Sequence, residues 1–468
     1  MNQEFIQAIY NFIPETRVLT ELEDLYSYSF DASFGEYLPE LVIQPKDPDE
    51  ISKVVKLANK YLVPIYPRGS ATSLSGGPLP VEGGVVLDMS RMNKKLVIDK
   101  ENLLAIASPG VITADIHLAA EEVGLFYPPD PSSSHVSTIG GNLLENSSGP
   151  KGLKYGTTKE YVIRLEIVTP KGEIVRTGGK TVKNVTGYDL TRLIVGSEGT
   201  LAIVTEVTLR LIPKPKARKT LLATFNQLVD SGYAITKILA NGILPAAMEL
   251  MDNSCIRAVE NFQPCGLPID AEALIIIEVD GHPLAIDEEI RACEEICFSV
   301  GATSVKVANS DHERDEIWRA RKMVSPAITE LGPTKISEDA TVPRSQIPAM
   351  MERLKEIREK YQLTLVVFGH AGDGNMHPNI ITDKRNIEEM KRVEDAVSEI
   401  FEVAVELGGT LSGEHGIGTL KAPYLEMELG EAGVDLMKSI KEAWDPNHIL
   451  NPGKIFPKPG VKKVVLTE

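Results

Sequence analysis

Two histidines and a glutamate–histidine pair lie in glycine-rich segments in the second half of this 468-residue chain. The segment LTLVVFGHAGDGNMHPNI has the pattern of a strand, a tight glycine turn and a return strand, which would bring His370 and His377 together across the turn. Farther along, LSGEHGIG carries Glu414 and His415 between glycines. Two histidines and one carboxylate form a common catalytic metal set that leaves coordination positions open. Histidines in turns are more often structural, so spacing alone leaves both interpretations open.

Glu414 and His415 are sequence neighbours, and neighbouring side chains in an extended backbone point to opposite faces. The two residues cannot easily bind the same ion, so we assign Glu414 to the metal and leave His415 off it. A free imidazole titrates near neutral pH, which suits a general base. The ligand set accepts zinc, iron or manganese, and the sequence does not select one of them.

The run DHERDEIWRARKMVSP, which begins at Asp311, predicts a helix that ends before Pro326. On this helix Arg321 would lie on the same side as Trp318, with Ser325 one turn farther on. A guanidinium can bind a carboxylate through two parallel hydrogen bonds, which fix orientation as well as charge. A solvated basic helix face is the alternative, and these residues alone do not decide between the two.

Three glycine- and serine-rich elements follow one another in the first half. The loop PRGSATSLSGG (67–77) follows a short strand, and its inward N–H groups and hydroxyls can wrap a pyrophosphate. The loop PPDPSSSHVSTIGGNLLENSSGP (128–150) is longer than an ordinary connection between two elements, and long ordered loops are usually functional. The third, GSEGTLAIVTEVTLRL (196–211), is a glycine turn that leads into a strand. No G-x-G-x-x-G follows a strand, and GGKT (178–181) lacks the leading glycine of a phosphate loop, so a nucleotide must be bound in another way.

Composition narrows the class of protein. Apolar residues make up 43% and charged residues 25%, as in globular proteins, and the length predicts two or three domains. The net charge of −17 argues against nucleic acid or an anionic membrane as a partner. No apolar run approaches the roughly 20 residues of a membrane helix, and no leader pattern is seen, so we expect no transmembrane segment and a cytoplasmic location. The cysteines lack the spacing of a metal or iron–sulfur set, so we expect buried or idle thiols at Cys255, Cys265, Cys293 and Cys297.

The predicted secondary structure changes in character twice along the chain. Residues 1–60 are predicted to be helical with short breaks, ending in a helix begun by Pro48. Short β-rich runs and loops follow as far as Pro213, after which longer amphipathic helices alternate with strands such as ALIIIEVDG. We predict domains over 1–213 and 214–415, and a C-terminal segment over 416–468 with one helix around Val434–Ala443.

The three ordered loops and the histidine motifs resemble the vanillyl-alcohol oxidase/p-cresol methylhydroxylase superfamily, in the branch that contains the FAD-linked subunit of glycolate oxidase and FAD-linked D-lactate dehydrogenases. The resemblance extends from Leu41 to Phe456. It implies an α+β fold in which a two-part FAD-binding domain is followed by an α/β substrate (cap) domain with an antiparallel sheet. The C-terminal segment is expected to return to the FAD domain.

The same resemblance implies non-covalent FAD, because Ala71 stands at the centre of the first loop and no cysteine precedes Cys255. The pyrophosphate is expected on the loop 68–77, the ring beside 131–142 and 146–149, and the adenosine end beside 198–204. The residues expected to bind FAD are Arg68, Gly69, Ser70, Ala71, Thr72, Ser73, Gly76, Gly77, Pro131, Ser132, Thr138, Gly140, Gly141, Asn142, Asn146, Ser148, Gly149, Tyr155, Glu198, Gly199, Ile203, Val204 and Asn451.

Matched to the family's G-H-x-G-D-G-N-x-H and E-H-G motifs, one divalent metal ion is expected on His370, His377 and Glu414, with His415 as the base. The family's W-x-x-R arginine, which holds the substrate carboxylate, falls on Arg321. Further substrate contacts are expected from Ser325, Asn379 and Lys335. Some relatives use a lysine where this chain has Ser337, with Lys335 two residues earlier, so the lysine contact departs from the family pattern.

We therefore expect FAD-dependent oxidation of a small D-2-hydroxy acid to the 2-oxo acid, with lactate favoured over glycolate. Proton removal by His415 would accompany hydride transfer to flavin N5. Within its branch the chain looks most similar to the dehydrogenase subunit of bacterial electron-bifurcating lactate dehydrogenases, which implies an electron-transfer flavoprotein or another acceptor protein as partner. The alternatives are a flavin-dependent transferase of the alkyl-dihydroxyacetone-phosphate synthase type and a non-catalytic electron-relay subunit. The intact metal and arginine motifs count against the relay subunit.

Overall fold

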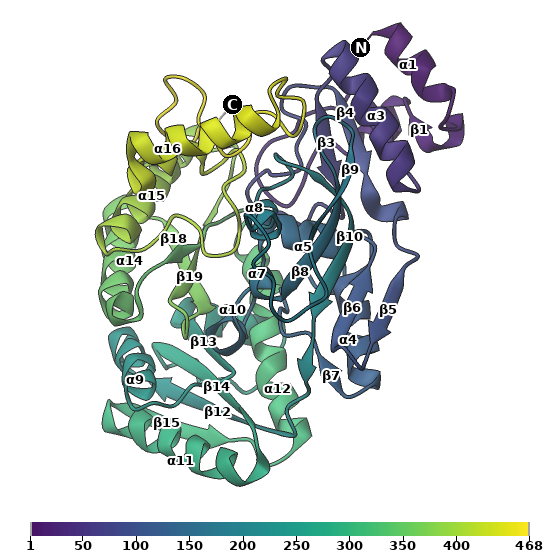
Figure 1. Ribbon diagram of the computed structural model, residues 1–468. Coiled ribbons are helices and arrows are strands. Elements are labelled where there is room, and N and C mark those ends of the chain that lie inside the picture. The colour runs from purple at the N-terminus through teal and green to yellow at the C-terminus, as the bar shows by residue number, and fades with distance from the viewer. Residues whose placement is uncertain (1, 467–468) are drawn as a thin grey trace. The chain divides into compact units, whose positions relative to one another are not determined.

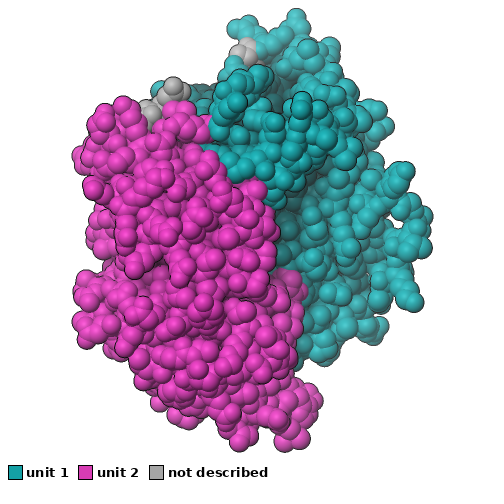
Figure 2. Space-filling model, turned by 90° about the vertical axis from the view of Figure 1, so that its left-hand side faces the viewer, with its two compact units in different colours: residues 1–148, 157–214, 414–462 teal, residues 149–156, 215–413, 463–468 magenta. Residues whose placement is uncertain are grey.

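The computed structural model describes residues 2–466 and divides into two compact units. Unit 1 comprises 1–148, 157–214 and 414–462, and unit 2 comprises 149–156, 215–413 and 463–468 (Figure 2). The main divisions lie within two residues of the expected ones. The segment 149–156, expected in the first domain, belongs instead to unit 2, and the segment 414–462 belongs to unit 1.

Unit 1 opens with a small, mostly parallel sheet in the order β1-β2-β4-β3. As predicted, Pro48 begins α3, and Asp47 caps it by accepting a hydrogen bond from the Glu50 amide at 2.9 Å. The expectation of helix with short breaks through residues 1–60 was wrong between α2 and α3. Residues 27–40 contain no helix, and the buried run LVI forms β2, which pairs with β1 and β4. The elements are α1 (Gln3–Tyr10), β1 (Val18–Leu19), α2 (Leu22–Tyr26), β2 (Leu41–Ile43), α3 (Pro48–Tyr61), β3 (Ile65–Arg68) and β4 (Val85–Asp88).

A second sheet of unit 1 is antiparallel, in the order β5-β6-β10-β8-β9. The strand predicted in GSEGTLAIVTEVTLRL forms β10 of this sheet. Its elements are β5 (Leu96–Asp99), β6 (Leu104–Ala107), α4 (Thr113–Glu122), β7 (Leu125–Phe126), α5 (Ile139–Glu145), α7 (Thr158–Tyr161), β8 (Val162–Val168), β9 (Ile174–Gly178), α8 (Leu190–Ile194), β10 (Ile203–Arg210) and β11 (Ile212–Pro213), of which β7 and β11 pair separately.

Unit 1 closes with α16 (Leu425–Trp444), which is longer than the predicted helix around Val434–Ala443. A break at Gly430, where φ is 66°, explains why the pattern before it was not recognised as helical. The coil after α16 pairs with β3 through Ile65 and Leu450, and both side chains join the core around α1 and α3. The return of the C-terminal segment to the first domain is therefore a feature of the structure.

Unit 2 is built on one antiparallel sheet in the order β15-β12-β14-β13-β18-β19-β16, with β17 also paired to β19. This arrangement confirms the α+β fold expected from the sequence. The strands are β12 (Ala217–Phe225), β13 (Ala247–Asp252), β14 (Ala273–Gly281), β15 (Ala302–Val307), β16 (Thr334–Ser337), β17 (Ala340–Thr341), β18 (Thr364–His370) and β19 (Asn375–Thr382).

Helices cover this sheet on both sides (Figure 1). On one side lie α9 (Leu228–Ala240), α11 (Pro283–Ser299), α14 (Ile347–Tyr361) and α15 (Ile387–Glu406). On the other lie α10 (Asn253–Phe262), α12 (Asp311–Lys322) and α13 (Val324–Ile328), and α6 (Gly152–Tyr155) contacts β13. Three of the four cysteines are buried thiols within these layers. Among residues 2–466, the structure has no helix that meets the length and hydropathy needed to span a membrane.

Candidate active site

Polar side chains gather on one face at the middle of the unit 2 sheet. The register pairs Glu249 with His370 across β13 and β18, and Phe368 with His377 across β18 and β19. Because side chains alternate along a strand, these residues share one face with Asn379. The rings of His370 and His377 lie with their centroids 5.1 Å apart, so the predicted hairpin does bring the two histidines together.

Glu249 is the residue of this face that the sequence analysis missed. Its Oε1 lies 2.7 Å from His370 Nδ1, and its Oε2 accepts hydrogen bonds from Arg321. A carboxylate can only accept, so Nδ1 of His370 carries the hydrogen and Nε2 is the nitrogen left for a ligand. Burial opposes ionisation of Glu249, but the charges of His370 and Arg321 outweigh it and hold the pKa of this carboxyl below its usual range.

Arg321 comes from α12, as predicted, and its side chain is buried against the polar face. Its Nε and Nη2 both lie 2.7 Å from Glu249 Oε2, and its guanidinium stacks 4.8 Å from the centroid of the Phe368 ring. The solvated helix face considered from the sequence is therefore excluded for this residue. Trp318, three residues earlier, donates its indole N–H to Glu278 at 2.9 Å.

The predicted helix was too long, and the error bears on Ser325. α12 ends at Lys322, and a separate helix, α13, begins at Val324 and contains Pro326 in its first turn, where a missing N–H costs nothing. Ser325 is thus not on the Arg321 helix. It does meet another predicted residue, because Lys335 Nζ donates to Ser325 Oγ at 3.2 Å, and burial lowers the pKa of Lys335.

Asn379 is fully buried on β19. Its Nδ2 donates to the His377 carbonyl at 2.8 Å, while its Oδ1 has no hydrogen-bond partner within the described part of the chain. A buried amide oxygen without a partner is costly, so this atom is suited to receive a donor from a bound molecule.

Glu414 follows directly on a segment that unit 2 holds in place. The carboxylate of Asp339 accepts from the Gly413 amide at 2.7 Å and from the Ser412 hydroxyl at 3.0 Å. Asp339 therefore fixes the backbone immediately before Glu414. Among residues 2–466, His370, His377 and Glu414 form the one group of three with donor atoms converging within 4.8 Å. Two are buried, and Glu414 is half-buried.

The loop that follows His415 is anchored in unit 1. The Glu198 carboxylate accepts from the amides of Ile417 and Gly418, each at 2.7 Å. Ser148, a predicted cofactor residue, donates to Glu414 Oε2 at 3.0 Å. The Glu198 side chain thus holds the two residues that directly follow the E-H-G segment, 414–416.

The predicted FAD loops surround a set of buried polar atoms in unit 1. Among the unit 1 atoms without a hydrogen-bond partner in the described chain, five lie in the second loop and α5, in the third loop or in the C-terminal coil: Ser137 Oγ, Glu145 Oε2, Ser147 Oγ, Ser197 Oγ and Asn451 Oδ1. Burial and the charge of Glu198 raise the pKa of Glu145 well above its usual value. Concentrated in three loops that are far apart in sequence, these atoms match a polar cofactor and not an apolar core.

Backbone geometry in these loops leaves no room for side chains at several glycines. A Cβ on Gly69 would lie 2.2 Å from Thr138 Oγ1, and one on Gly140 would lie 2.9 Å from the Pro109 carbonyl oxygen. Thr138 caps α5 by accepting from the Gly141 amide, and Asn146 ends that helix in a left-handed conformation. The first and second loops are therefore packed against each other.

Other predicted cofactor residues lie in or beside these loops. Arg68 turns its guanidinium toward the carbonyls of Ser27, Tyr28 and Phe30, so these hydrogen bonds brace a neighbouring loop. Tyr155 lies on α6 in unit 2, where its hydroxyl donates to Asp280 at 2.8 Å. The others occupy the loop after β3, the loop before α5, α5 itself, the segment after α5, the turn before β10 and the start of β10: Gly69, Ser70, Ala71, Thr72, Ser73, Gly76, Gly77, Pro131, Ser132, Gly140, Gly141, Asn142, Gly149, Gly199, Ile203 and Val204.

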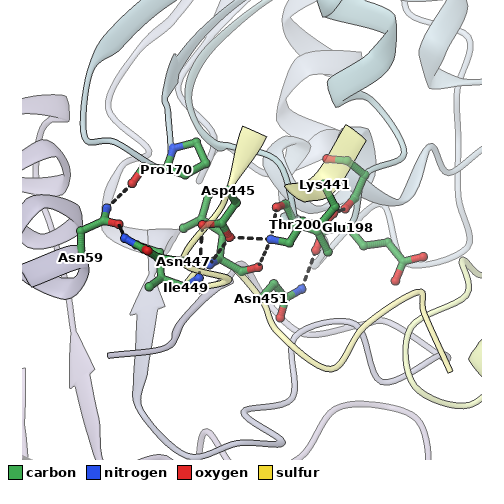
Figure 3. Close-up of polar contacts among 11 residues, drawn as sticks. Asn59, Pro170, Glu198, Thr200, Lys441, Asp445, Asn447, Ile449 and Asn451 are labelled. Carbon is green, nitrogen blue, oxygen red and sulfur yellow. Dashed lines mark hydrogen bonds and ion pairs between the residues drawn. The ribbon is translucent and has the colours of Figure 1, made fainter. Parts of the chain in front are cut away.

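Asn451 connects two of the loops from the C-terminal coil. Its Nδ2 donates to the carbonyl of Gly77. It also donates to the carbonyl of Glu198 (Figure 3). Lys441 lies beside it, paired with Asp445 and donating to the carbonyls of Thr200 and Leu450. The C-terminal coil therefore supports the loops with buried polar contacts.

The comparisons agree with this architecture. The family described as "FAD linked oxidases, C-terminal domain" matches residues 214–455, and the "FAD binding domain" family matches residues 39–178. Glycolate oxidase subunit GlcD of Bacillus subtilis (strain 168) is 50% identical over 440 residues, which are 94% of this chain and 93% of that protein. D-lactate dehydrogenase of Anaerostipes hadrus is 35% identical over 97% of both chains.

A solved structure of p-cresol methylhydroxylase with substrate bound has a TM-score of 0.81 at 19% identity, covering 97% of this chain and 96% of that one. At this identity the likeness shows the fold alone, which is the two-domain fold of the vanillyl-alcohol oxidase type. The chain belongs to the FAD-linked oxidase family and is an FAD-linked oxidoreductase.

Proposed function

We propose that this protein oxidises a small D-2-hydroxy acid to the 2-oxo acid, with non-covalent FAD as the acceptor and one divalent metal ion held by His370, His377 and Glu414. The observation that carries the proposal is the convergence on one sheet face of a buried arginine and two histidines. A 2-hydroxy acid has a carboxylate and a hydroxyl on adjacent carbons. Its binding site therefore needs a cation for the carboxylate close to a metal ion for the hydroxyl, and Arg321 lies beside the two histidines in this way.

The FAD loops fit the cofactor. The unpartnered buried atoms of Ser147, Ser197 and Asn451 provide donors and acceptors. The glycine-rich backbone of the first loop supplies N–H groups of the kind that bind a pyrophosphate. Ala71 offers no atom for a covalent link to the flavin. When bound, FAD supplies the acceptor for the hydride that leaves C2 of the substrate.

The metal site fits a cation that accepts nitrogen and oxygen ligands. His370 presents Nε2, since Nδ1 is bound to Glu249, and Glu414 supplies an anionic oxygen. When bound, the ion acts as a Lewis acid that lowers the pKa of the substrate hydroxyl.

The chain's own residues bind and orient the substrate. The Nε and Nη2 groups of Arg321 are held by Glu249, so we assign the Nη1 side of the guanidinium to the substrate carboxylate. Lys335, with Ser325 beside it, adds a second cationic contact. Asn379, whose Oδ1 has no partner among the described residues, is assigned to contact the substrate or the metal. His415 takes the hydroxyl proton as general base, on a loop that Glu198 holds in place.

Reduced flavin must pass its electrons on, and we propose an electron-transfer flavoprotein or a similar acceptor protein. The support is the resemblance noted from the sequence. Reduction of an electron-transfer flavoprotein by substrate-reduced protein tests this partner, and absence of both reduction and co-purification would remove it.

One experiment tests the main proposal. Purified protein is mixed without oxygen with D-lactate, L-lactate, glycolate or D-2-hydroxybutyrate, and the flavin absorbance near 450 nm is followed, with metal analysis of the same sample. We expect D-lactate to bleach the flavin much faster than L-lactate, and one metal ion per chain. No bleaching by any of these acids would contradict the proposal and favour the flavin-dependent transferase.

A further inference from the structure

Glu249 has a carboxylate that serves two different predicted functions. One oxygen faces the imidazole of His370 at 2.7 Å, and the other faces the guanidinium of Arg321 at 2.7 Å. The residue has 0% of its surface exposed and lies on β13, in the middle of the unit 2 sheet. The three groups form one buried chain of hydrogen bonds, all within unit 2.

This series of hydrogen bonds constrains the charge and the orientation of all three side chains. A buried carboxylate needs both its partners, and an arginine buried without its anion is strongly unfavourable. The bond to Nδ1 fixes the tautomer and the ring plane of His370, which sets the direction of Nε2. The bonds to Nε and Nη2 fix the plane of the Arg321 guanidinium in the same way.

The ring of Phe368 strengthens this arrangement. The Arg321 guanidinium lies 4.8 Å from the centroid of this ring, and the His377 ring lies 5.5 Å from it. The second histidine of the pair and the arginine thus pack on one aromatic side chain. Neither can move without disturbing groups that touch the other.

We propose that Glu249 is a positioning residue that couples the metal ligand His370 to the carboxylate-binding residue Arg321. Through this one carboxylate, metal binding and substrate-carboxylate binding become linked, so that each site tightens the other. The inference rests on the proposed function, which supplies the metal and the substrate carboxylate. It adds a residue and a coupling that the proposed function does not require.

The test compares Glu249→Gln with Glu278→Gln in FAD-loaded protein. Glutamine can accept only one of the two hydrogen bonds, because its second terminal atom is a donor. Glu278 is a matched control: it is buried on the same face of the neighbouring strand β14 and also has two partners, Trp318 and Thr220, but contacts neither His370 nor Arg321. The readouts are the Zn²⁺ dissociation constant by chelator competition and KM for D-lactate.

We expect Glu249→Gln to weaken Zn²⁺ binding by about 10–100-fold and to raise KM, with flavin content close to wild type. The thermal midpoint should fall, because the buried Arg321 loses its anion. Glu278→Gln should leave Zn²⁺ affinity unchanged. Unaltered Zn²⁺ affinity in Glu249→Gln would overturn the inference. An equal loss in both variants would overturn it too, because it would reveal a general effect on the sheet.

A second measurement isolates the coupling. Arg321→Gln should weaken Zn²⁺ binding in the wild-type background although Arg321 is not a ligand, and should have little effect in the Glu249→Gln background. Equal effects of Arg321→Gln in both backgrounds would overturn the coupling even if the variants fold poorly. A wild-type protein that binds no metal would overturn the proposed function itself, and that result is obtained before any variant is compared.

Discussion

Glu198 and Gly418 are joined by a hydrogen bond of 2.7 Å between a carboxylate oxygen and a backbone amide, although 220 residues separate them. The other oxygen of Glu198 binds the Ile417 amide at the same distance. Glu198 lies in the third flavin loop, where its φ of 52° places its backbone in the left-handed conformation of a tight turn. A residue expected to bind the adenosine end of FAD thus supports the loop of the proposed base.

Glu198→Gln should slow turnover because glutamine presents an NH₂ donor to one of the two amide N–H groups. Loss of one bond and the new donor–donor contact is expected to cost about 1–3 kcal/mol, which corresponds to a fall of about 5–150-fold in kcat. Turnover per bound flavin is the measurement. Glu206→Gln, at a partly exposed carboxylate paired with Lys95, is the control and should leave kcat within about twofold. Wild-type turnover in Glu198→Gln would contradict this role for the carboxylate.

His377→Ala should abolish stoichiometric metal while FAD remains bound, because the flavin loops belong to unit 1 and His377 to unit 2. Elemental analysis and the flavin absorbance of the same sample measure both quantities. His312→Ala is the matched control, since this histidine is exposed on α12 and pairs only with Glu316. A full metal complement in His377→Ala would show that this histidine is not a ligand.

Arg321→Lys keeps the charge but removes the planar fork. We expect KM for D-lactate to rise by about 10–100-fold, because a lysine cannot hold Glu249 and a substrate carboxylate at once. Steady-state kinetics with an artificial acceptor give the value. Arg319→Lys, two residues away and about half exposed, should leave KM unchanged. An unchanged KM in Arg321→Lys would assign the substrate carboxylate to another group.

Lys454 predicts a pH dependence of stability. Burial lowers the pKa of Lys454 to about 7, although the charges of Glu198 and Asp31 oppose that shift. An unfolded lysine has a pKa of about 10.4, so above pH 7 the unfolded chain binds the extra proton and stability rises with pH. The slope contributed by this residue is at most about 1.4 kcal/mol per pH unit.

Lys454→Met should therefore flatten the pH dependence of the free energy of unfolding of the flavin-free protein between about pH 7 and pH 9. Urea unfolding at several pH values measures the slope. Lys462→Met, at an exposed position eight residues later, is the control. Identical slopes for wild type and Lys454→Met would mean that Lys454 does not titrate in this range.

Asp445→Ala should destabilise the protein by about 3–5 kcal/mol, because it leaves Lys441 buried without its anion. Burial already lowers the pKa of Lys441, and Asp445 is the partner that opposes this effect (Figure 3). Denaturant unfolding measures the change. Asp435→Ala removes an exposed partner of Lys438 and should cost less than about 1 kcal/mol. Similar losses in the two variants would contradict the buried-pair argument.

Local pattern was sufficient for much of this fold. The capped helix at Pro48, the strand ALIIIEVDG and the histidine hairpin were all predicted from periodicity and turn residues, since these signals lie within a few residues of one another. Ser325 was misplaced because the pattern of α12 does not reveal where its last turn ends. The strand LVI was missed because three buried residues have no periodicity to recognise.

The sequence by itself indicated the class of chemistry, because its three ordered glycine-rich loops and its histidine motifs resemble those of a known family. The same resemblance pointed to Arg321, although the helix pattern alone left a solvated face open. Only the tertiary structure decided that Glu249 bridges His370 and Arg321 and that Glu198 supports the loop after His415. Both glutamates lie in ordinary strand or turn sequence, and their partners are 72 or more residues away along the chain. Strand register and buried hydrogen bonding select such partners, and neither leaves a local signature.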